Sequence, residues 1–303
     1  MKAVVFEHFG GSEVLRFAEV EEPHAGPGQV RLNVKAVGVN PVDSAVRRGL
    51  MQQILPVTLP AVPGFEAAGV VDEVGDGVTG ISVGDEVLGH TITGAYAQYA
   101  LSPAADVAAK PAGLGWEQAA ALPIAVETSD RVLETLKVTG GETLLVNGAA
   151  GVAASVGVQL AIARGATVIG TASEANHDYL RSLGAIPITY GDGLADRVRA
   201  AAPQGIDAVF DAGHGALEVF VDLRGGTTDR IVTIADDHAH DLGITFSTGP
   251  RPHFGSALAD FARLAANGRL SVRIDRSLTL ADAAQAQDVS ESGHPRGKLI
   301  LLP

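Results

Sequence analysis

The stretch that decides the fold runs from Thr143 to Arg164 and reads TLLVNGAAGVAASVGVQLAIAR. Its first five residues form a short apolar run with β-branched side chains, which is typical of a buried parallel strand. Four small residues, Gly148 to Gly151, follow, and Val152 to Arg164 is apolar on most faces, as in a helix packed on a sheet. A strand, a turn of small residues and a helix form the unit that cradles a dinucleotide pyrophosphate, because the helix start offers unpaired N–H groups.

The spacing of the small residues leaves two interpretations open. Gly148, Gly151 and Ala154 follow the pattern G-x-x-G-x-x-A and not the G-x-G-x-x-G of many dinucleotide-binding proteins. Taken alone, the turn fits either a cofactor cradle or an ordinary strand-to-helix turn. The rest of the chain is needed to choose between them.

Composition sets the broad class. A chain of 303 residues is long enough for two domains, and a net charge of −13 disfavours nucleic-acid binding. The absence of cysteine excludes disulfides, thiolate zinc sites and a cysteine nucleophile. No apolar run is long enough to span a bilayer, and the N-terminal sequence lacks the apolar core of a signal peptide. We therefore expect a cytoplasmic protein without nucleic-acid or membrane partners.

The first 122 residues are predicted to be rich in β-structure. Short strand candidates alternate with glycine- and proline-containing turns, which favours a partly open barrel. The expected strands are Lys2–Phe6, Gln29–Val37, Ala67–Val74, Glu86–Leu88 and Ala95–Ala100.

From about residue 123 to residue 250, strands and helices alternate regularly. This alternation predicts a doubly wound parallel sheet that binds ligands at the carboxyl ends of its strands. The expected strands are Thr143–Asn147, Thr167–Gly170, Ile186–Thr189, Ala208–Asp211, Arg230–Ile234 and Ile244–Ser247. The expected helices are Gly151–Arg164, Ala175–Leu183, Leu194–Ala201, Gly215–Leu223 and Ser256–Ala266.

Several segments resemble the catalytic domain of the medium-chain dehydrogenase/reductase superfamily: MKAVVFEHFGGSEVL, VGVNPVDSAVRRG, VPGFEAAGVVDEVGDGV, VGDEVLG and GAYAQYA. The resemblance is closest to the zinc-free, zeta-crystallin-like quinone oxidoreductases and their enoyl-reductase relatives, and it continues through NGAAG to RGKLILL. It implies an α/β protein with a GroES-like partly open β-barrel domain (residues 1–122 and 251–303) and a Rossmann domain (residues 123–250). It also implies hydride transfer from NADPH to a quinone or an α,β-unsaturated carbonyl, and a homodimer along Ile244–Ser247.

The resemblance also bears on metal binding. Zinc-dependent relatives place a Cys where Val39 and Asn40 stand, and a His–Glu pair where Phe65 and Glu66 stand. Phe65 replaces that His, which leaves Glu66 without this partner. The run Asp236 to Asp241 contains acids and histidines, but a hydrophilic loop after a strand explains it equally well. We expect no metal site.

The predicted cofactor-binding residues combine the glycine turn with positions that the resemblance implies. They are Asn40, Thr128, Gly148, Ala150, Gly151, Val152, Ala153, Ser173, His177, Tyr190, Ala235 and Arg296. The strand before Ser173 lacks the acid that usually binds the ribose of NAD, and Ser173 and Tyr190 match NADPH-binding members. The phosphate-binding Lys of those members is missing, so His177, Asn176, Arg181 or Arg296 would cover part of its role. NADPH is favoured over NADH.

One further departure concerns the turn of the cofactor site. Val152 and Ala154 stand where relatives have glycines, and the Val152 side chain narrows the approach to the pyrophosphate. Thr128 matches a Thr that faces the nicotinamide in the family. A helix N-cap is the alternative role for Thr128.

The catalytic predictions rest on Asn40 and Asp43. Asn40 is expected to donate a hydrogen bond to the substrate oxygen, with loop capping as the alternative. Asp43 is expected to orient Asn40 or to relay a proton, with capping of the following helix as the alternative. Tyr96 and Tyr99 fit barrel packing better than catalysis.

Three functions remain open at this point. Many relatives carry tyrosines near the positions of Ala45 and Met51, and this chain has neither. Without these tyrosines as proton donors, a proton from solvent would complete the reduction of a quinone. The leading prediction is the NADPH-dependent quinone or enone reductase. The alternatives are a tailoring reductase for one specialised metabolite and an NADPH-binding protein without turnover.

Overall fold

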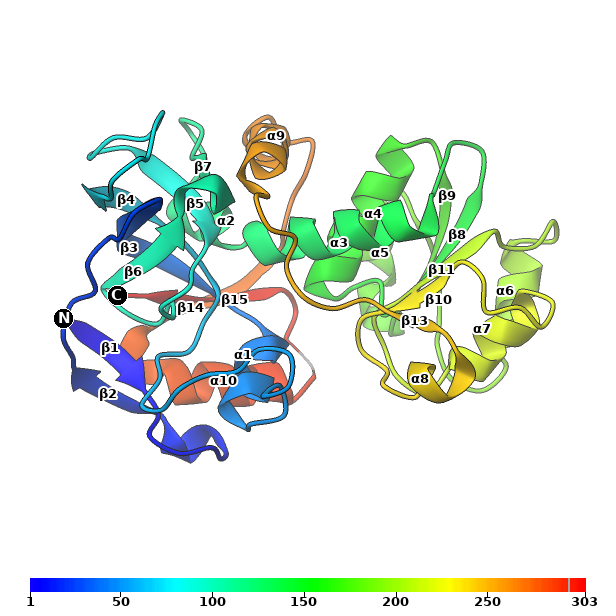
Figure 1. Ribbon diagram of the computed structural model, residues 1–303. Helices are drawn as coiled ribbons and strands as arrows, with labels where there is room; N and C mark the ends of the chain where they lie inside the picture. The colour runs from blue at the N-terminus through cyan, green and yellow to red at the C-terminus, as the bar shows by residue number, and fades with distance from the viewer. Residues whose placement is uncertain (294) are drawn as a thin grey trace. The chain divides into compact units, whose positions relative to one another are not determined.

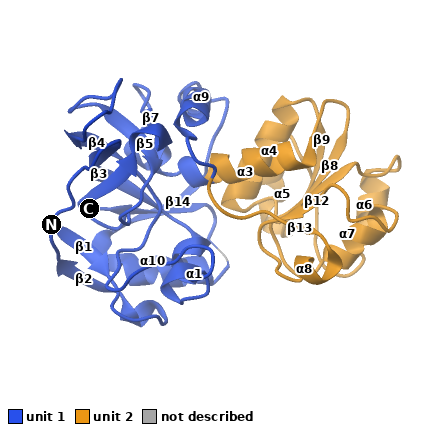
Figure 2. Cartoon of the chain, in the orientation of Figure 1, with its two compact units in different colours: residues 1–124, 251–303 blue, residues 125–250 orange. Residues whose placement is uncertain are grey.

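The chain folds into two compact units in the computed structural model, which describes residues 1–293 and 295–303. Unit 1 comprises Met1–Ile124 and Arg251–Pro303, and unit 2 comprises Ala125–Pro250 (Figure 2). The chain crosses from unit 1 to unit 2 inside helix α3, Pro123–Leu136, between Ile124 and Ala125. Within the described residues, no helix is both long and apolar enough to span a membrane.

Unit 2 contains a six-stranded parallel sheet with the spatial order β10-β9-β8-β11-β12-β13. Its strands are β8 (Thr143–Asn147), β9 (Thr167–Thr171), β10 (Ile186–Ile188), β11 (Ala208–Asp211), β12 (Ile231–Thr233) and β13 (Thr245–Phe246). This is the 3-2-1-4-5-6 order of dinucleotide-binding sheets, which confirms the predicted doubly wound sheet. The last predicted strand, Ile244–Ser247, is shorter than expected because only Thr245 and Phe246 pair with β12.

Helices flank this sheet (Figure 1). Those after α3 are α4 (Val152–Ala163), η3 (Glu174–Asn176), α5 (His177–Ser182), α6 (Leu194–Ala201), α7 (Leu217–Leu223) and α8 (Ala239–Leu242). A glycine allows α4 to approach the sheet closely, because a Cβ on Gly157 would lie 2.7 Å from the Phe210 ring of β11. Leu145, Val209 and Phe220 belong to the buried core that results.

Unit 1 contains a seven-stranded sheet and a separate hairpin, β1 with β2. The strands are β1 (Lys2–Val5), β2 (Arg16–Glu19), β3 (Gln29–Val39), β4 (Glu66–Val74), β5 (Glu86–His90), β6 (Tyr99–Pro103), β7 (Val107–Ala109), β14 (Ile274–Thr279) and β15 (Lys298–Leu302). One edge of β3 pairs with β4, and the other pairs first with β6 and then with β15. This divided pairing wraps the strands around one core, which holds Phe6, Leu32 and Tyr96.

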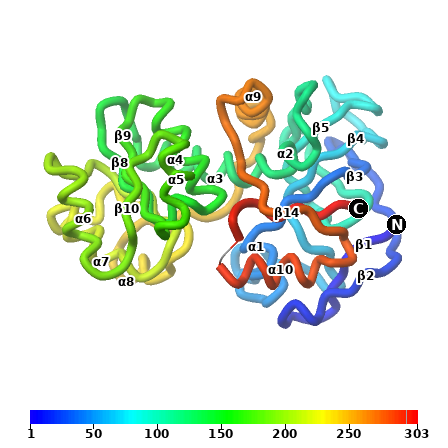
Figure 3. The backbone as a smooth tube through the Cα atoms, turned by 180° about the vertical axis from the view of Figure 1, so that it is seen from behind, coloured from blue at the N-terminus to red at the C-terminus, as the bar shows by residue number. Residues whose placement is uncertain are grey.

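Short helices close unit 1. They are η1 (Ser12–Val14), α1 (Pro41–Arg47), η2 (Ala104–Asp106), α2 (Trp116–Ala120), α9 (Gly255–Ala266), η4 (Leu280–Asp282) and α10 (Ala283–Glu291). Helices α1 and α10 lie side by side although more than 230 residues separate them in sequence, as Figures 1 and 3 show from opposite sides. The buried Arg47 of α1 forms an ion pair with Glu291 of α10.

One predicted strand is displaced. The sequence predicted a strand over Ala95–Ala100, but β6 begins at Tyr99 and the residues before it form a turn with a single bridge between Ala97 and Ala3. The amides of Ala95 and Tyr96 both donate to the carbonyl of Pro63, which bends the backbone out of a ladder and buries Tyr96. Strands β2, β7 and β14 were not predicted.

Candidate active site

The turn between β8 and α4 has the shape that an anion requires. Gly148 has a φ of +68°, and a Cβ there would lie 2.9 Å from the carbonyl oxygen of Ala212. The Ala149 amide donates to the carbonyl of Thr171 at 2.9 Å, which fixes the turn on the neighbouring strand. Gly151 is the N-cap of α4, so the first amides of that helix have no acceptor within the helix. A dinucleotide pyrophosphate fits this turn.

A row of buried polar side chains supports the turn. Four adjacent strands each end in one such residue: Thr171 of β9, Asn147 of β8, Asp211 of β11 and Thr233 of β12. Thr171 Oγ1 donates to Asn147 Oδ1 at 2.6 Å, and Asn147 Nδ2 donates to Asp211 Oδ1 at 2.7 Å. Thr233 Oγ1 donates to Asp211 Oδ2 at 2.6 Å. We call these four residues the strand-end row, and it fixes the sheet edge across all four strands.

The strand-end row contacts the backbone of the surrounding loops. The Gly148 amide donates to Thr171 Oγ1 at 3.0 Å, and the Gly213 amide donates to Asp211 Oδ1 at 3.2 Å. Burial raises the pKa of Asp211. This row was not predicted, although Asn147 and Asp211, which each end a predicted strand, were a partial signal.

The other predicted cofactor residues of unit 2 also follow carboxyl ends of strands. Ser173 follows β9 and accepts a hydrogen bond from Asn176 Nδ2 at 3.2 Å. His177 begins α5, and its Nε2 atom is buried without a hydrogen-bond partner among the described residues. Tyr190 follows β10 and is exposed. Ala235 follows β12, and its amide donates to Thr233 Oγ1 at 3.1 Å.

Two predicted residues lie elsewhere. Thr128 is half-buried in the second turn of α3, so the alternative role as a helix N-cap is wrong. Arg296 is exposed and belongs to unit 1, in the segment before β15. Ala150, Val152 and Ala153 are half-buried in the turn and the start of α4.

In unit 1, Asn40 is the N-cap residue of α1 and is almost completely buried. Its Nδ2 atom donates to Glu66 Oε1 at 2.8 Å and lies 3.4 Å from the carbonyl oxygen of Gly38. Its Oδ1 atom accepts a hydrogen bond from Lys298 Nζ at 2.5 Å. The amide donor that was predicted to face a substrate is therefore directed at acceptors of the protein.

Asp43 occupies the third position of α1 and is completely buried. Its Oδ2 atom accepts hydrogen bonds from the Asn40 amide at 2.9 Å and from the Tyr96 hydroxyl at 2.8 Å. Its Oδ1 atom is buried without a partner among the described residues. Burial raises the pKa of Asp43 to about 7. Asp43 thus stabilises the helix start, as the alternative interpretation held, and also holds a proton near neutral pH.

Glu66 has partners that the sequence did not predict. Lys298 Nζ lies 2.5 Å from Glu66 Oε1, and both side chains are buried. The Ile124 amide at the start of α3 donates to Glu66 Oε2 at 2.7 Å. Among the described residues, no group of three or more His, Asp or Glu side chains is arranged to hold a metal ion. A buried ammonium beside Glu66 does not fit a cation at this place.

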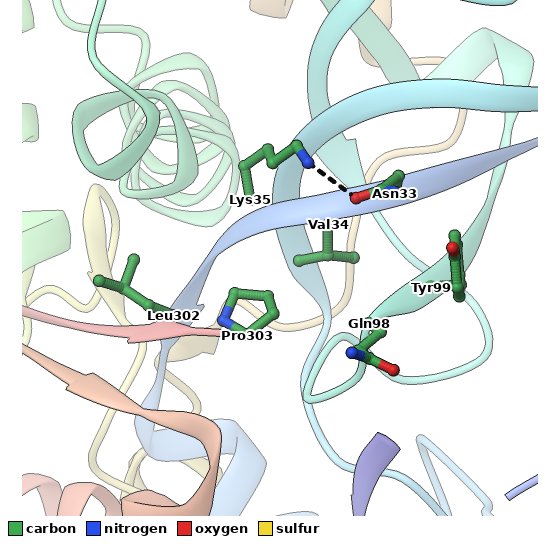
Figure 4. A pocket seen from close by; sticks show the side chains of 7 residues that line it. All are labelled: Asn33, Val34, Lys35, Gln98, Tyr99, Leu302 and Pro303. Atoms are coloured by element: carbon green, nitrogen blue, oxygen red, sulfur yellow. Dashed lines mark hydrogen bonds between the residues drawn. The ribbon is translucent and has the colours of Figure 1, made fainter. Parts of the chain in front are cut away.

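A surface pocket of unit 1 lies apart from these residues (Figure 4). It has a volume of about 320 Å³, and Lys35 Nζ donates to Asn33 Oδ1 beside it at 2.9 Å. Its lining residues are Asn33, Val34, Lys35, Gln98, Tyr99, Leu302 and Pro303. None of the residues predicted to act in catalysis or cofactor binding lines it.

Known proteins share this architecture. Residues 26–112 match the alcohol dehydrogenase GroES-like domain, and residues 183–301 match the zinc-binding dehydrogenase family. The NADPH-dependent alkenal/one oxidoreductase of Arabidopsis thaliana is 30% identical over 327 residues, which cover all of this chain and 80% of that protein. The chain belongs to the medium-chain dehydrogenase/reductase superfamily.

Two relatives cover this medium-chain dehydrogenase/reductase from end to end. The quinone oxidoreductase of Mus musculus is 28% identical over 334 residues, covering 100% of this chain and 98% of that protein. The structure of the quinone oxidoreductase from Coxiella burnetii has a TM-score of 0.88 at 29% identity, covering 100% of this chain and 99% of that chain. The predicted fold class, a GroES-like domain with a Rossmann domain, is confirmed.

Proposed function

We propose that this medium-chain dehydrogenase/reductase is an NADPH-dependent reductase that transfers hydride to a quinone or an α,β-unsaturated carbonyl. Relatives over the full chain carry these two activities in their names. The observation that carries the proposal is the Gly148 turn, which stands at the start of α4 and is supported by the strand-end row. Hydrogen bonds hold this cradle in place, and a preorganised site of this kind favours tight dinucleotide binding.

The residues of unit 2 divide the binding of the cofactor among them. The amides of Val152 and Ala153, with Gly148, Ala150 and Gly151, would hold the pyrophosphate. Ser173, His177 and Tyr190 would hold the adenosine 2′-phosphate, and Thr128 and Ala235 would face the nicotinamide half. When bound, NADPH supplies the hydride.

Residues of unit 1 would stabilise the negative charge that develops on the substrate oxygen. Negative charge develops on the substrate oxygen during reduction and is stabilised by donors that are already oriented. Asn40 supplies such a donor if its Nδ2 atom exchanges the 3.4 Å contact with Gly38 for the substrate oxygen. Asp43 orients Asn40 through the backbone amide, and a solvent proton completes the reduction.

We propose that hydride transfer proceeds without zinc, although one matching family is described as zinc-binding. The chain contains no cysteine. Glu66 is occupied by an ammonium and two hydrogen-bond donors, and Phe65 stands beside it. The ammonium repels a divalent cation, and the phenyl ring cannot ligate one. No step of the proposed reaction therefore depends on a divalent cation.

The assembly and location are part of the same proposal. Strand β13 is the last strand of the parallel sheet, so a second copy can extend the sheet along Thr245 and Phe246 as a homodimer. Sedimentation of the purified protein tests this, and a monomer at micromolar concentration contradicts it. We place the protein in the cytoplasm, which cell fractionation tests.

Titration and turnover test the function. NADPH and NADH are titrated into the purified protein by fluorescence, and oxidation of NADPH is then followed with a quinone and with an enone. We expect NADPH to bind about tenfold more tightly, a difference of about 1.4 kcal/mol, and to be oxidised by one acceptor class. Binding without turnover would favour a non-catalytic NADPH-binding protein, and turnover of only one specialised substrate would favour a tailoring reductase. No binding of either cofactor contradicts the proposal.

A further inference from the structure

The proposed reaction does not explain the buried ammonium of Lys298. We call this residue and its neighbours Glu66, Asn40 and Gly38 the junction of unit 1. Lys298 begins β15, and its side chain is 2% exposed. A buried ammonium is costly unless it is paired and hydrogen-bonded. Its Nζ atom lies 2.5 Å from Glu66 Oε1 and 2.5 Å from Asn40 Oδ1, so both partners are charged or polar.

The neighbouring backbone provides space for this pair. Gly38 lies on β3, and a Cβ at this position would stand 2.7 Å from Lys298 Cε and would also meet Glu66 Oε1. Only a residue without a side chain leaves room for the ammonium and the carboxylate together. The glycine, the lysine and the glutamate thus form one packed arrangement from three strands, β3, β15 and β4.

Lys298 gives the Asn40 amide a single orientation. An amide can be turned by 180° with little change in shape, and its hydrogen-bond partners decide which end is oxygen. Lys298 has only donors and therefore fixes Oδ1, whereas Glu66 accepts from Nδ2 at 2.8 Å. The ammonium and the carboxylate therefore favour the same orientation of the amide, and removing Lys298 takes the charged donor away from Oδ1.

Glu66 extends the junction to the start of α3. Its second oxygen, Oε2, accepts the amide of Ile124 at 2.7 Å, and Ile124 is the last residue of unit 1. A carboxylate at the first turn of a helix is stabilising because the amides there lack helical acceptors. The Lys298 ammonium pairs with this carboxylate at a completely buried position.

We propose that Lys298 is a positioning residue for hydride transfer, which orients Asn40 directly and holds the first turn of α3 through Glu66. This inference rests on the proposed function for its kinetic consequences. Its structural consequence, the protection of two backbone amides, is independent of any activity. The experiment therefore measures both turnover and the exchange of these amides.

The charges of the junction also act on Asp43, which provides a specific signature. The ammonium of Lys298 lowers the pKa of Asp43, and the carboxylate of Glu66 raises it. Tyr96 is the other titratable group in contact with Asp43. Replacing Lys298 should therefore move the titration of Asp43 to higher pH, and replacing Glu66 should move it to lower pH. Substitutions that only destabilised unit 1 would not move the Asp43 titration in opposite directions.

The test compares Lys298→Met, Glu66→Gln and the double variant with a control, Lys110→Met. Lys110 is a partly buried lysine of unit 1 whose carboxylate partner is Glu86 of β5, at 2.8 Å. For Lys298→Met we expect kcat to fall by about tenfold or more, as misplaced catalytic groups do, with little change in the NADPH dissociation constant. The control should keep the kcat of the wild type.

Hydrogen exchange provides the readout that does not need turnover. The amides of Asn40 and Ile124 should exchange faster in Lys298→Met than in the wild type, and those of β8 in unit 2 should be unchanged. If Lys298→Met does not fold because Glu66 keeps an unpaired charge, the double variant removes both charges and is expected to fold with low kcat.

Each outcome is decisive. Wild-type kcat in a folded Lys298→Met or double variant overturns the proposal. Lowered kcat with shifts of the pH profile in the same direction for both single variants also overturns it, because that indicates a structural role alone. If the wild-type protein reduces no quinone or enone, the proposed function fails, and unchanged exchange at Asn40 and Ile124 would then be needed to overturn the positioning role.

Discussion

Tyr96 and Asp43 form a hydrogen bond in the interior of unit 1, in which the Tyr96 hydroxyl donates to Asp43 Oδ2 at 2.8 Å and neither side chain is exposed. The sequence separates them by 53 residues, and the turn that displaced the predicted strand is what brings Tyr96 to this place. Burial raises the pKa of Tyr96 well above its ordinary value, so the phenol remains a donor throughout the neutral range. The Asp43 carboxyl is the partner that titrates.

Asp43 should make the protein less stable as the pH rises toward neutrality. Its folded pKa of about 7 lies above the ordinary value of 3.8, so its contribution to stability is present below pH 3.8 and is lost as the pH rises through 7. A shift of about three pKa units corresponds to something on the order of 4 kcal/mol. In Asp43→Asn the amide oxygen still accepts both hydrogen bonds, and this loss of stability with pH should disappear.

Denaturant unfolding between pH 4 and pH 8 measures this effect. Asp76→Asn, which removes an exposed carboxylate of the same unit, is the control and should follow the wild type. Parallel stability curves for the wild type and Asp43→Asn would show that Asp43 does not hold its proton in the folded protein.

The sequence predicted those parts of the fold that depend on neighbours in the chain. Strands β8 and β11 begin and end at the predicted residues, because each is a continuous apolar run that ends in one polar side chain. The parallel, doubly wound character of the sheet followed from the alternation of strands and helices.

The junction of unit 1 was not predictable in the same way. Lys298 and Glu66 stand 232 residues apart, and no local pattern indicates that they meet. Glu66 was expected to lack a histidine partner because Phe65 replaces that histidine, and the structure gives it a lysine from the last strand instead. Similarly, an N-cap role for Thr128 stayed open because the first turn of α3, whose Ile124 amide donates to Glu66 Oε2, is not visible in the sequence.

Removing the hydroxyl of Thr233 should destabilise the strand-end row. This hydroxyl donates to Asp211 at 2.6 Å and accepts the amides of Ala235 and Asp236 at 3.1 Å each. Thr233→Val leaves a buried carboxylate oxygen and two amides without this partner, which should cost about 2 kcal/mol of unfolding free energy. Thr233→Ser keeps the hydroxyl and is the matched control. Equal unfolding free energies for the two variants would mean that the row contributes packing alone.

A methyl group at Gly148 should weaken cofactor binding more than it weakens the fold. Gly148→Ala adds the strain of an alanine at a φ of +68° and a contact 2.9 Å from the Ala212 carbonyl, both at the turn that holds the pyrophosphate. Gly141→Ala is the control, because Gly141 has a φ of +86° but a Cβ there meets no atom within 4 Å. Both variants should lose about 1 kcal/mol of stability, and only Gly148→Ala should bind NADPH about tenfold more weakly. Equal NADPH affinities would place the pyrophosphate elsewhere.

His177 should contribute to the preference for NADPH over NADH. Its Nε2 atom is buried without a hydrogen-bond partner among the described residues, directly after the η3 turn that Ser173 begins. A buried polar atom without a partner is costly, and a phosphate oxygen would satisfy it. His177→Ala should therefore weaken NADPH binding roughly fivefold, the factor that about 1 kcal/mol gives, and should leave NADH binding unchanged.

Fluorescence titrations with both cofactors measure this preference. His240→Ala is the control, because His240 is an exposed histidine of the same unit that stacks on Phe246 and follows a different strand. A parallel loss of NADPH and NADH affinity in His177→Ala would indicate that the imidazole supports the loop and does not contact the 2′-phosphate. An unchanged preference would leave Ser173 and Tyr190 as the residues of unit 2 that distinguish the two cofactors.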